Sequence, residues 1–207
     1  MTDDDPRRYS PAAERNGPHL LEALKQRLPR HGTLLEVASG TGQHAACLGA
    51  GLPRWAWWPT DADPDALASI RAWCQGLANV RLPILLDVLS EPWPATLPLG
   101  VDAVYCANLI HIAPWTCTGA LMRGAARHLS GHGRLFTYGP YLEDDVPTAP
   151  GNLAFDADLR ERDPAWGLRR LTDVQAQAQA VGLFLQERVA MPANNRLLVW
   201  ARQAPGA

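Results

Sequence analysis

The stretch Thr33-Leu-Leu-Glu-Val-Ala-Ser-Gly-Thr-Gly42 decides the fold, because an apolar run there ends in a glycine-rich turn. Residues 33–38 predict a buried strand, and the residues after Gly42 predict a helix that runs to about Gly51. Glycines at positions 40 and 42 allow positive φ angles and let the backbone approach a ligand closely. The first turn of the helix then offers unpaired N–H groups and a positive dipole end to a carboxylate or phosphate.

Apolar runs alternate with amphipathic helical stretches along the rest of the chain. Further strands are predicted at residues 55–60, 80–86, 101–107, 134–138, 183–189 and 196–201, and helices after Asp63 and at residues 114–129 and 172–181. Asp63 and Pro64 form a typical helix start, and Gly131 and Gly182 occupy positions of C-terminal caps. The link between the last two strands is too short for a parallel crossover, so these strands form an antiparallel hairpin.

These elements predict a single α/β domain over residues 1–207. Its sheet is doubly wound and mostly parallel, with seven strands and an antiparallel C-terminal hairpin strand. The connection 139–171 is long and rich in Pro, Gly and Asp, which is typical of a functional loop or of one that holds a short helix. Together with the N-terminal segment 1–18 it is a candidate lid over the carboxyl ends of the strands, where ligands bind in such sheets.

Composition argues against several classes of function. The formal net charge is −2 and the charged residues are scattered, so no nucleic-acid partner is expected. No apolar run approaches the roughly 20 residues that span a bilayer, and the acidic start Met1-Thr-Asp-Asp-Asp-Pro is unlike a signal peptide, so we expect a cytoplasmic protein without a membrane partner. The four cysteines lack paired spacing and the histidines lack ligand spacing, so no metal site is expected. We expect a monomer or a homodimer.

Asp61 ends the second predicted strand, 19 residues after Gly42, where a doubly wound fold places the acid that binds ribose hydroxyls. A nucleotide-containing cofactor is therefore expected, and two kinds fit. Gly40-Thr-Gly-Gln-His-Ala45 matches the G-x-G-x-x-A fingerprint, which keeps an NAD(P)-dependent oxidoreductase open. Three other features resemble class I S-adenosylmethionine-dependent methyltransferases instead: Glu36 inside the motif, Asp87 at the end of the third strand, and the terminal hairpin.

Seven stretches of distinctive sequence extend the likeness over the chain from about residue 8 to residue 202. They are residues 9–16, 36–44, 108–115, 138–141, 152–156, 162–167 and 191–195. Through them the chain resembles a poorly characterised family of methyltransferase-like class I proteins found in bacteria and animals. The resemblance implies the Rossmann-like class I methyltransferase fold and S-adenosyl-L-methionine as cofactor, but it implies no particular methyl acceptor. The chain departs from the class I motif at Ala38, where the first glycine usually falls.

The resemblance also implies where the cofactor binds. It places Glu36 toward the methionine amino group and Asp87 toward the adenine amino group. The expected cofactor-binding residues belong to the glycine-rich motif and to the strand ends after it: Glu36, Ala38, Ser39, Gly40, Gly42, His44, Asp61, Asp87, Val88 and Asn108.

Polar and aromatic residues of the same stretches follow the later strands. His111 is the expected general base, since an unperturbed histidine pKa of about 6.5 suits proton transfer near neutrality; a structural histidine is the alternative. Asn108 and Tyr138 complete the expected catalytic set, and the expected substrate-binding residues are Tyr9, Arg15, Tyr141, Asn194 and Asn195. The expected reaction is methyl transfer to an O, N or S nucleophile of a small molecule. A non-catalytic S-adenosylmethionine-binding protein stays open beside the oxidoreductase.

Overall fold

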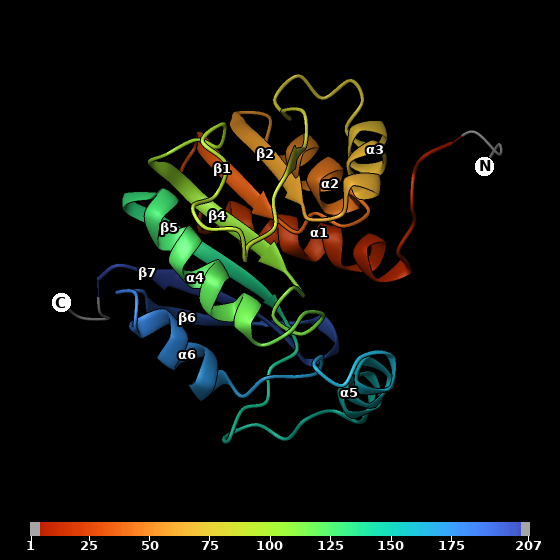
Figure 1. Cartoon of the computed structure of the whole chain (residues 1–207), viewed down its shortest axis with the longest axis vertical. Coiled ribbons are helices and arrows are strands. Elements are labelled where there is room, and N and C mark those ends of the chain that lie inside the picture. The colour runs from red at the N-terminus through yellow and green to blue at the C-terminus, as the bar shows by residue number, and fades with distance from the viewer. Residues whose placement is uncertain (1–4, 204–207) are drawn as a thin grey trace.

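A computed structural model describes residues 5–203, so most of the acidic start lies outside the described residues. Seven strands form one sheet in the order β3-β2-β1-β4-β5-β7-β6 (Figure 1). Their bounds are β1 Gly32–Val37, β2 Trp55–Asp61, β3 Ile84–Leu85, β4 Val101–Ala107, β5 Leu129–Gly139, β6 Phe184–Met191 and β7 Asn195–Ala201. The strands from β1 to β5 pair in parallel, and β7 is antiparallel to both of its neighbours. The predicted mostly parallel seven-stranded fold is therefore confirmed.

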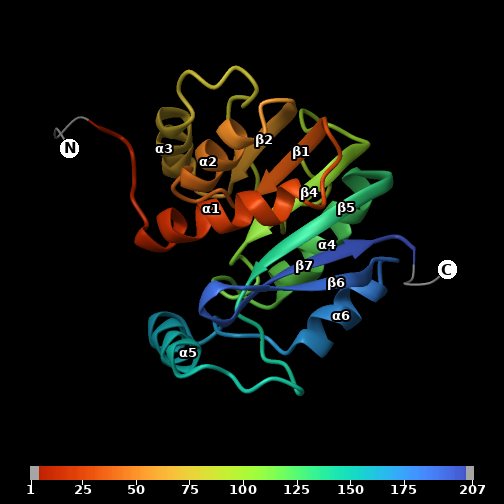
Figure 2. The ribbon, with the colours of Figure 1, turned by 180° about the vertical axis from the view of Figure 1, so that it is seen from behind.

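Helices cover both faces of this sheet. They are α1 Pro11–Lys25, α2 Gln43–Gly51, α3 Pro64–Trp73, α4 Thr116–His128, α5 Pro150–Arg162 and α6 Leu171–Gln179, and the 3₁₀ turn η1 spans Pro192–Asn194. Helices α4 and α6 lie over the face toward the viewer in Figure 1, and α1 lies over the opposite face in Figure 2. Helix α5 covers neither face, since it lies beyond the strand ends and contacts η1.

The two faces of the sheet carry separate apolar cores. Leu35 and Val104 belong to the core under α4 and α6, whereas Leu34 and Tyr105 belong to the core under α1, α2 and α3. Successive residues of a strand point to opposite faces, so a central strand that is buried on both faces needs a continuous apolar run. Burial on both faces explains why residues 33–38 and 101–107 are mostly apolar.

Two predicted boundaries are wrong. The third strand was expected over residues 80–86, but only Ile84 and Leu85 pair with β2, and Val80 adds an isolated bridge. Pro83 interrupts the run, because proline has no N–H group to donate to the sheet. The fourth helix ends at His128 and β5 begins at once, so Gly131 lies in a strand and caps no helix.

Helix α1 was not expected from the sequence as a helix. Ser10 caps its start by accepting a hydrogen bond from Ala13 N at 3.3 Å, and Pro11 follows at the first position. Gly17 and Pro18 conceal the helical pattern, since both residues are poor helix formers. Gly17 allows the two helices to pack closely, because a Cβ at this position would lie 3.0 Å from Cys47 Sγ of α2. A tight α1–α2 contact thus explains the unfavourable residue.

Candidate functional site

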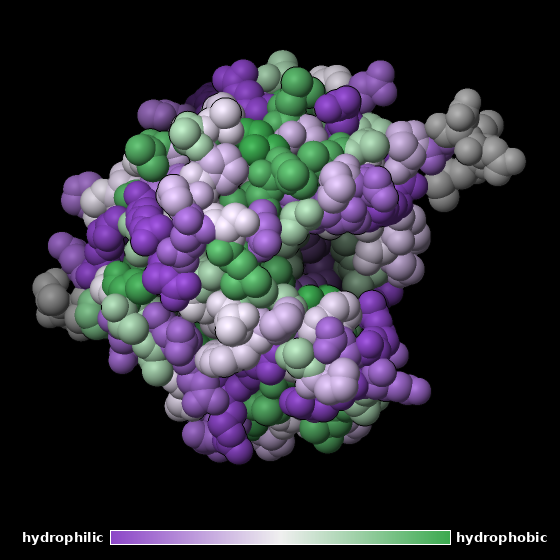
Figure 3. All heavy atoms as spheres, viewed as in Figure 1, coloured by the Kyte–Doolittle hydropathy of each residue, from purple (hydrophilic) through white to green (hydrophobic). Residues whose placement is uncertain are grey.

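A cavity of about 800 Å³ lies at the carboxyl ends of β1, β2 and β4. Figure 3 shows a hollow on this side of the molecule, near the tip of β4 and between the N-terminal end of α1 and α5 in the view of Figure 1. Its walls come from the glycine-rich turn, the strand ends and two more distant segments, and they include Ala38, Ser39, Gly40, Thr41, His44, Asp61, Asp87, Val88, Asn108, Arg162 and Trp166. The structure thus brings together eight of the ten expected cofactor-binding residues at one cavity, Asn108 among them, while Glu36 and Gly42 do not line it.

The glycine-rich turn adopts the backbone geometry that its glycines allow. Gly40 and Gly42 have φ angles of +57° and +89°. A Cβ on Gly40 would meet no atom within 4 Å, whereas one on Gly42 would lie 2.6 Å from Ile70 Cα of α3. Gly40 therefore faces open space and Gly42 allows the turn to pack on α3. Ala38 also has a positive φ, +57°, so it occupies the left-handed conformation without being glycine.

The two strand-end carboxylates line the cavity in different ways. Asp61 accepts a hydrogen bond from Gly40 N at 2.7 Å and another from Asp63 N at 2.9 Å, so it also fixes the glycine-rich turn. Asp87 accepts from Leu89 N at 2.9 Å and lies beside Val88, which is buried. Both carboxylates keep further lone pairs for a ligand.

Glu36 is not among the described residues that line the cavity. Its carboxyl group is 2% exposed and accepts a 2.6 Å hydrogen bond from the indole N–H of Trp57. Burial raises the pKa of Glu36 to about 7, against the hydrogen bonds from Trp57 and Ser39 that lower it. Glu36 is therefore a buried residue that joins β1 to β2 through Trp57, and its expected contact with the methionine amino group stays a prediction.

Asn108 directly follows the last residue of β4. It has a φ of +61°, its N–H donates to the carbonyl of Tyr138 at 2.8 Å, and its own carbonyl accepts from the N–H groups of His111 and Ile112. The chain therefore turns sharply after the strand, with Asn108 and Ile112 on the cavity wall. His111 does not line the described part of the cavity.

The His111 ring is fully buried behind that wall. It contacts Tyr141 edge-on, with 4.8 Å between the ring centroids, and neither ring nitrogen has a hydrogen-bond partner among the described residues. A Cβ on Gly139 would lie 2.5 Å from His111 Nε2, so the glycine leaves the ring its room. Burial, and then the nearby Arg169 charge, lower the pKa of His111 to about 3. The imidazole is therefore neutral at physiological pH.

The expected tyrosines lie in different environments. Tyr138 and Tyr141 are buried, and burial raises the pKa of Tyr138 to about 12 and that of Tyr141 further. The Tyr141 hydroxyl donates to Thr137 Oγ1 at 3.0 Å. Tyr9 is exposed and its hydroxyl donates to Glu14. Neither buried phenol ionises near neutrality, so each can serve only as a hydrogen-bonding group there.

The remaining expected substrate-binding residues make local contacts. Asn194 accepts from Ala149 N at 3.2 Å and from the Asn152 side chain, which holds η1 against α5. Asn195 donates to Pro192 O at 3.0 Å within the same turn. Arg15 is an exposed residue of α1. None of the three lines the described part of the cavity.

The sequence interpretation missed several residues on the cavity wall. Arg8, Ser10 and Ala13 come from the N-terminal segment, and Arg162 and Trp166 come from the long connection. Both segments had been singled out as candidate lids, and the distinctive stretches 9–16 and 162–167 contain most of these residues. The sequence therefore indicated that these two segments matter, but no pattern within them showed which side chains line the cavity.

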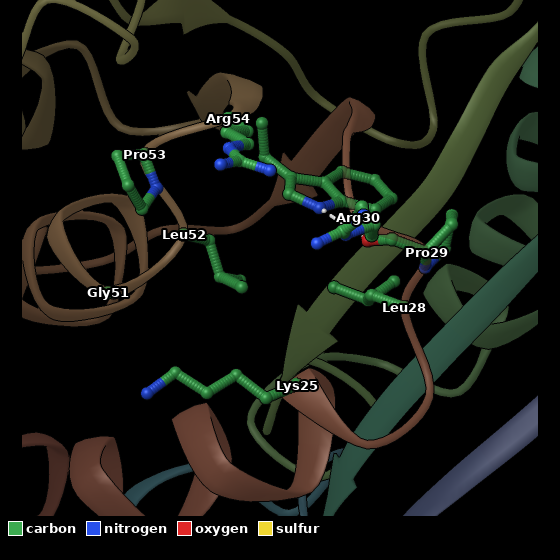
Figure 4. A pocket seen from close by; sticks show the side chains of 9 residues that line it. Lys25, Leu28, Pro29, Arg30, Gly51, Leu52, Pro53 and Arg54 are labelled. Atoms are coloured by element: carbon green, nitrogen blue, oxygen red, sulfur yellow. Dashed lines mark hydrogen bonds between the residues drawn. The ribbon is translucent and has the colours of Figure 1, made fainter.

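A second, smaller cavity of about 300 Å³ lies at the other end of β2 (Figure 4). Lys25, Arg30 and Arg54 surround it together with Trp55, whose indole N–H donates to Pro29 O at 3.1 Å. Lys25 ends α1, and a cation at that position stabilises the helix dipole. Lys25 therefore has a structural role here.

Two further classes of site receive no support from the described residues 5–203. His, Cys, Asp and Glu side chains form no group of three or more that could hold a metal ion there. No helix in that part of the chain is long and apolar enough to cross a bilayer.

Solved structures with the same fold include methyltransferases. The chain is similar to CalO1, described as a methyltransferase in calicheamicin biosynthesis in its SAH-bound form, with a TM-score of 0.73 and 17% identity over 93% of this chain and 54% of that one. It is similar to the S-adenosylmethionine-dependent methyltransferase SibL, with a TM-score of 0.74 and 23% identity over 92% and 55%. An O-methyltransferase family protein from Burkholderia thailandensis gives a TM-score of 0.72 and 16% identity over 92% and 57%. The chain spans about half the length of these proteins, and the likeness establishes the class I methyltransferase fold.

A family model matches nearly the whole chain. It covers residues 7–202, close to the range over which the seven distinctive stretches are spread. The chain therefore belongs to the family described as "Protein of unknown function (DUF938)".

Proposed function

We propose that this protein is an S-adenosylmethionine-dependent methyltransferase that acts on an O, N or S nucleophile of a small molecule. One observation carries the proposal: Asp61 and Asp87 line the same cavity, at the ends of neighbouring strands, beside the open turn at Gly40. In a doubly wound fold the first of these carboxylates is placed to accept hydrogen bonds from ribose hydroxyls. Asp87 and Val88, one strand further, are then assigned to the adenine ring. The methyltransferase fold supports this assignment.

The cavity supplies groups for the rest of the cofactor. Ala38, Ser39 and His44 lie around the start of α2, where the methionine part would bind. A bound S-adenosylmethionine supplies an electrophilic methyl group for in-line displacement, so the protein has to align the acceptor and exclude water. Asn108, on the cavity wall, is assigned to orient the acceptor.

His111 remains the proposed general base. The ring is neutral at physiological pH, and the one nitrogen that carries no proton can accept one. Burial lowers the pKa of His111 to about 3, so the ligand-free ring is a weak base, and the proposed role requires a bound acceptor to raise this pKa. The burial of the ring also requires the acceptor, or a water molecule, to reach it past Asn108. Tyr138 is assigned a hydrogen-bonding role.

The N-terminal segment and the long connection are proposed as a lid. Arg8 N donates to Ser69 Oγ at 2.8 Å, Trp73 Nε1 donates to Arg8 O at 2.8 Å, and the Arg8 guanidinium pairs with Asp63 at 2.6 Å. These contacts hold the segment against α3 at the cavity rim. Trp166 lies on the wall that the connection forms. A small acceptor would enter between these two segments.

Ligand-induced stabilisation tests the proposal. Thermal unfolding is followed with S-adenosylmethionine, S-adenosylhomocysteine, NAD and NADP, each at the same concentrations. We expect the two adenosyl ligands to raise the melting temperature and the dinucleotides to leave it unchanged. Stabilisation by NAD or NADP alone would contradict the proposal and favour an oxidoreductase. Transfer of a labelled methyl group to a panel of small-molecule acceptors then separates an enzyme from a protein that only binds the cofactor.

A further inference from the structure

The end of α5 and the segment after it place an arginine and a tryptophan on the cavity wall. Arg162 is the last residue of α5, and Trp166 lies in the segment that follows. The Arg162 guanidinium lies over the Trp166 ring, with 5.2 Å between its central carbon and the ring centroid. Such a cation–π contact holds a guanidinium in place and leaves its N–H donors for an acceptor. This arginine–tryptophan pair therefore offers positioned donors beside an aromatic surface.

The protein itself makes little use of the Arg162 guanidinium. Among residues 5–203, none accepts a hydrogen bond from it, and its ionic contact with Asp158 is long, at 3.8 Å. The other arginine on the cavity wall, Arg8, is neutralised by Asp63 at 2.6 Å. A guanidinium has five N–H donors and no acceptor, so an unpaired one favours an anionic partner. The cavity therefore has one cation left for a ligand on its described wall.

Hydrogen bonds attach the arginine–tryptophan pair to the loop that follows β4. Gly167 N, next to the tryptophan, donates to His111 O at 2.9 Å. The Arg169 side chain donates to Ile110 O at 3.1 Å and to Ala113 O at 3.0 Å. The segment after α5 is thus held against this loop, and the pair keeps its place without a ligand.

The order of the strands separates this pair from the carboxylates assigned to the nucleoside. Asp61 and Asp87 lie at the ends of β2 and β3, on one side of β1, whereas the loop with Asn108 follows β4, on the other side. Figures 1 and 2 show α3 beside β2 and α5 on the opposite side of the molecule. Leu109 and Ile112 of the same loop also line the cavity. The second side of the cavity thus combines an apolar wall, an indole ring and a cation.

We propose that the methyl acceptor is a small aromatic acid, whose carboxylate binds Arg162 and whose ring packs against Trp166. The planar guanidinium matches a carboxylate with two hydrogen bonds, and a flat apolar body fits beside an indole ring. The inference rests on the proposed function, which gives the first side of the cavity to the nucleoside and leaves the second to the acceptor. The carboxylate of the cofactor's methionine part has the same chemistry, and the experiment separates these two sources.

Matched pairs of aromatic acids and amides test the proposal. The probes are hydroxy-, amino- and mercaptobenzoates, each beside the benzamide with the same nucleophile, which has nearly the same shape and no charge. Calorimetry measures their binding to protein saturated with S-adenosylhomocysteine, and transfer of a labelled methyl group from S-adenosylmethionine is the second readout. The variants are Arg162→Met, which removes the charge, Arg162→Lys, which keeps the charge without the planar fork, and Trp166→Leu, which removes the ring.

Arg127 of α4 provides the matched control. Like Arg162, it lies in the last turn of its helix, where a cation stabilises the helix dipole, and its side chain is 54% exposed against 56%. It pairs with Glu91 at 3.1 Å and does not line the cavity. If Arg162 served only its helix, Arg127→Met and Arg162→Met would change the melting temperature alike and probe binding not at all.

We expect wild type to bind at least one of the acids about tenfold or more tightly than its amide, because hydrogen bonds between charged groups are strong. Arg162→Met should weaken binding of the acid by about tenfold and leave the amide within about twofold, and the same change should appear in KM rather than in kcat. Arg162→Lys should retain part of the preference. Trp166→Leu should weaken both members of a pair, and Arg127→Met should bind them as wild type does.

Each other outcome has a definite meaning. If S-adenosylhomocysteine binds but acids and amides bind equally, or no probe binds, the inference is overturned and the proposed function stands. If Arg162→Met weakens binding of S-adenosylhomocysteine and leaves the ratio between acid and amide unchanged, Arg162 belongs to the cofactor's carboxylate, which also overturns the inference. If wild type does not bind S-adenosylhomocysteine, the proposed function fails and this inference fails with it.

Discussion

Replacing Glu36 by glutamine should stabilise the ligand-free protein at pH 8 and change its stability little at pH 4.5. Glutamine keeps the shape of the side chain, and its carbonyl oxygen can still accept the 2.6 Å hydrogen bond from the Trp57 indole. What the substitution removes is the charge. Because the site is fully buried, the wild-type protein has to hold an ionised carboxylate in an apolar environment at high pH.

The size of the effect follows from the pKa of Glu36. Burial raises this pKa from 4.5 in the unfolded chain to about 7 in the folded protein. A raised pKa stabilises the fold fully below pH 4.5, and that contribution is lost as the pH rises through 7. At about 1.4 kcal/mol per pH unit, the loss amounts to roughly 3 kcal/mol, and above pH 7 it is constant. Glu36→Gln should therefore be about 3 kcal/mol more stable than wild type at pH 8.

Urea unfolding of both proteins at pH 4.5, 6, 7 and 8 measures this difference. The two proteins have to be compared with each other at each pH. Burial lowers the pKa values of His44 and His111, so the unfolding free energy of both proteins falls as the pH drops below 6.5, which is opposite to the effect of Glu36. We expect the difference in unfolding free energy to grow with pH and to level off near pH 7. A difference that stays constant from pH 4.5 to 8 would refute the reasoning, since Glu36 would then be ionised to the same extent in both states.

Three further predictions concern the site and the core. Asp61→Asn should weaken S-adenosylhomocysteine binding about tenfold or more, because the amide loses charge-assisted bonds to ribose and to the glycine-rich turn; unchanged affinity in calorimetry would contradict this. His111→Leu should abolish most turnover while cofactor affinity persists. The lowered pKa of His111 stabilises the fold above pH 6.5, and this contribution is lost progressively as the pH falls. When the pH is lowered from 6.5 to 5, the unfolding free energy of the variant in urea titrations should therefore fall by about 2 kcal/mol less than that of wild type. Thr137→Val should cost about 3 kcal/mol in thermal unfolding, because Tyr141 and Trp200 both donate to Thr137 Oγ1 at 3.0 Å, and a loss below 1 kcal/mol would mean that both donors find other acceptors.

Local patterns predicted several residues that the structure brings together at one cavity, and their binding roles stay predictions. The turn at residues 38–42 and the position of Asp61 depend on the order of a strand, a turn and a helix, which neighbouring residues determine. The cavity contains both. The register of the sheet brings Asp87 to the same place, although most of its predicted strand is not paired. Short-range sequence therefore determined which strand ends meet at the cavity.

Such local patterns could not predict in which direction a side chain points just after a strand. His111 was expected to face the ligand, but the positive φ of Asn108 turns the chain so that Ile112 lines the cavity and His111 lies behind it. No rule based on residue type foresees a left-handed asparagine at that point. Asn194, also with a positive φ, similarly directs its side chain to α5.

A contact between Tyr105 and His44 joins the core beneath α1 to the cavity wall at the first turn of α2. Glu36 and Tyr105 are paired across β1 and β4 and are both buried in that core, and the Tyr105 hydroxyl reaches His44 at the cavity wall. The N-terminal segment is attached to the same place, because Ser10 N donates to Gln43 Oε1 at 2.6 Å. A ligand in the cavity would thus contact the first turn of the helix to which the segment is attached. If the protein binds S-adenosylmethionine as proposed, we expect the bound cofactor to stabilise the attached N-terminal segment as well.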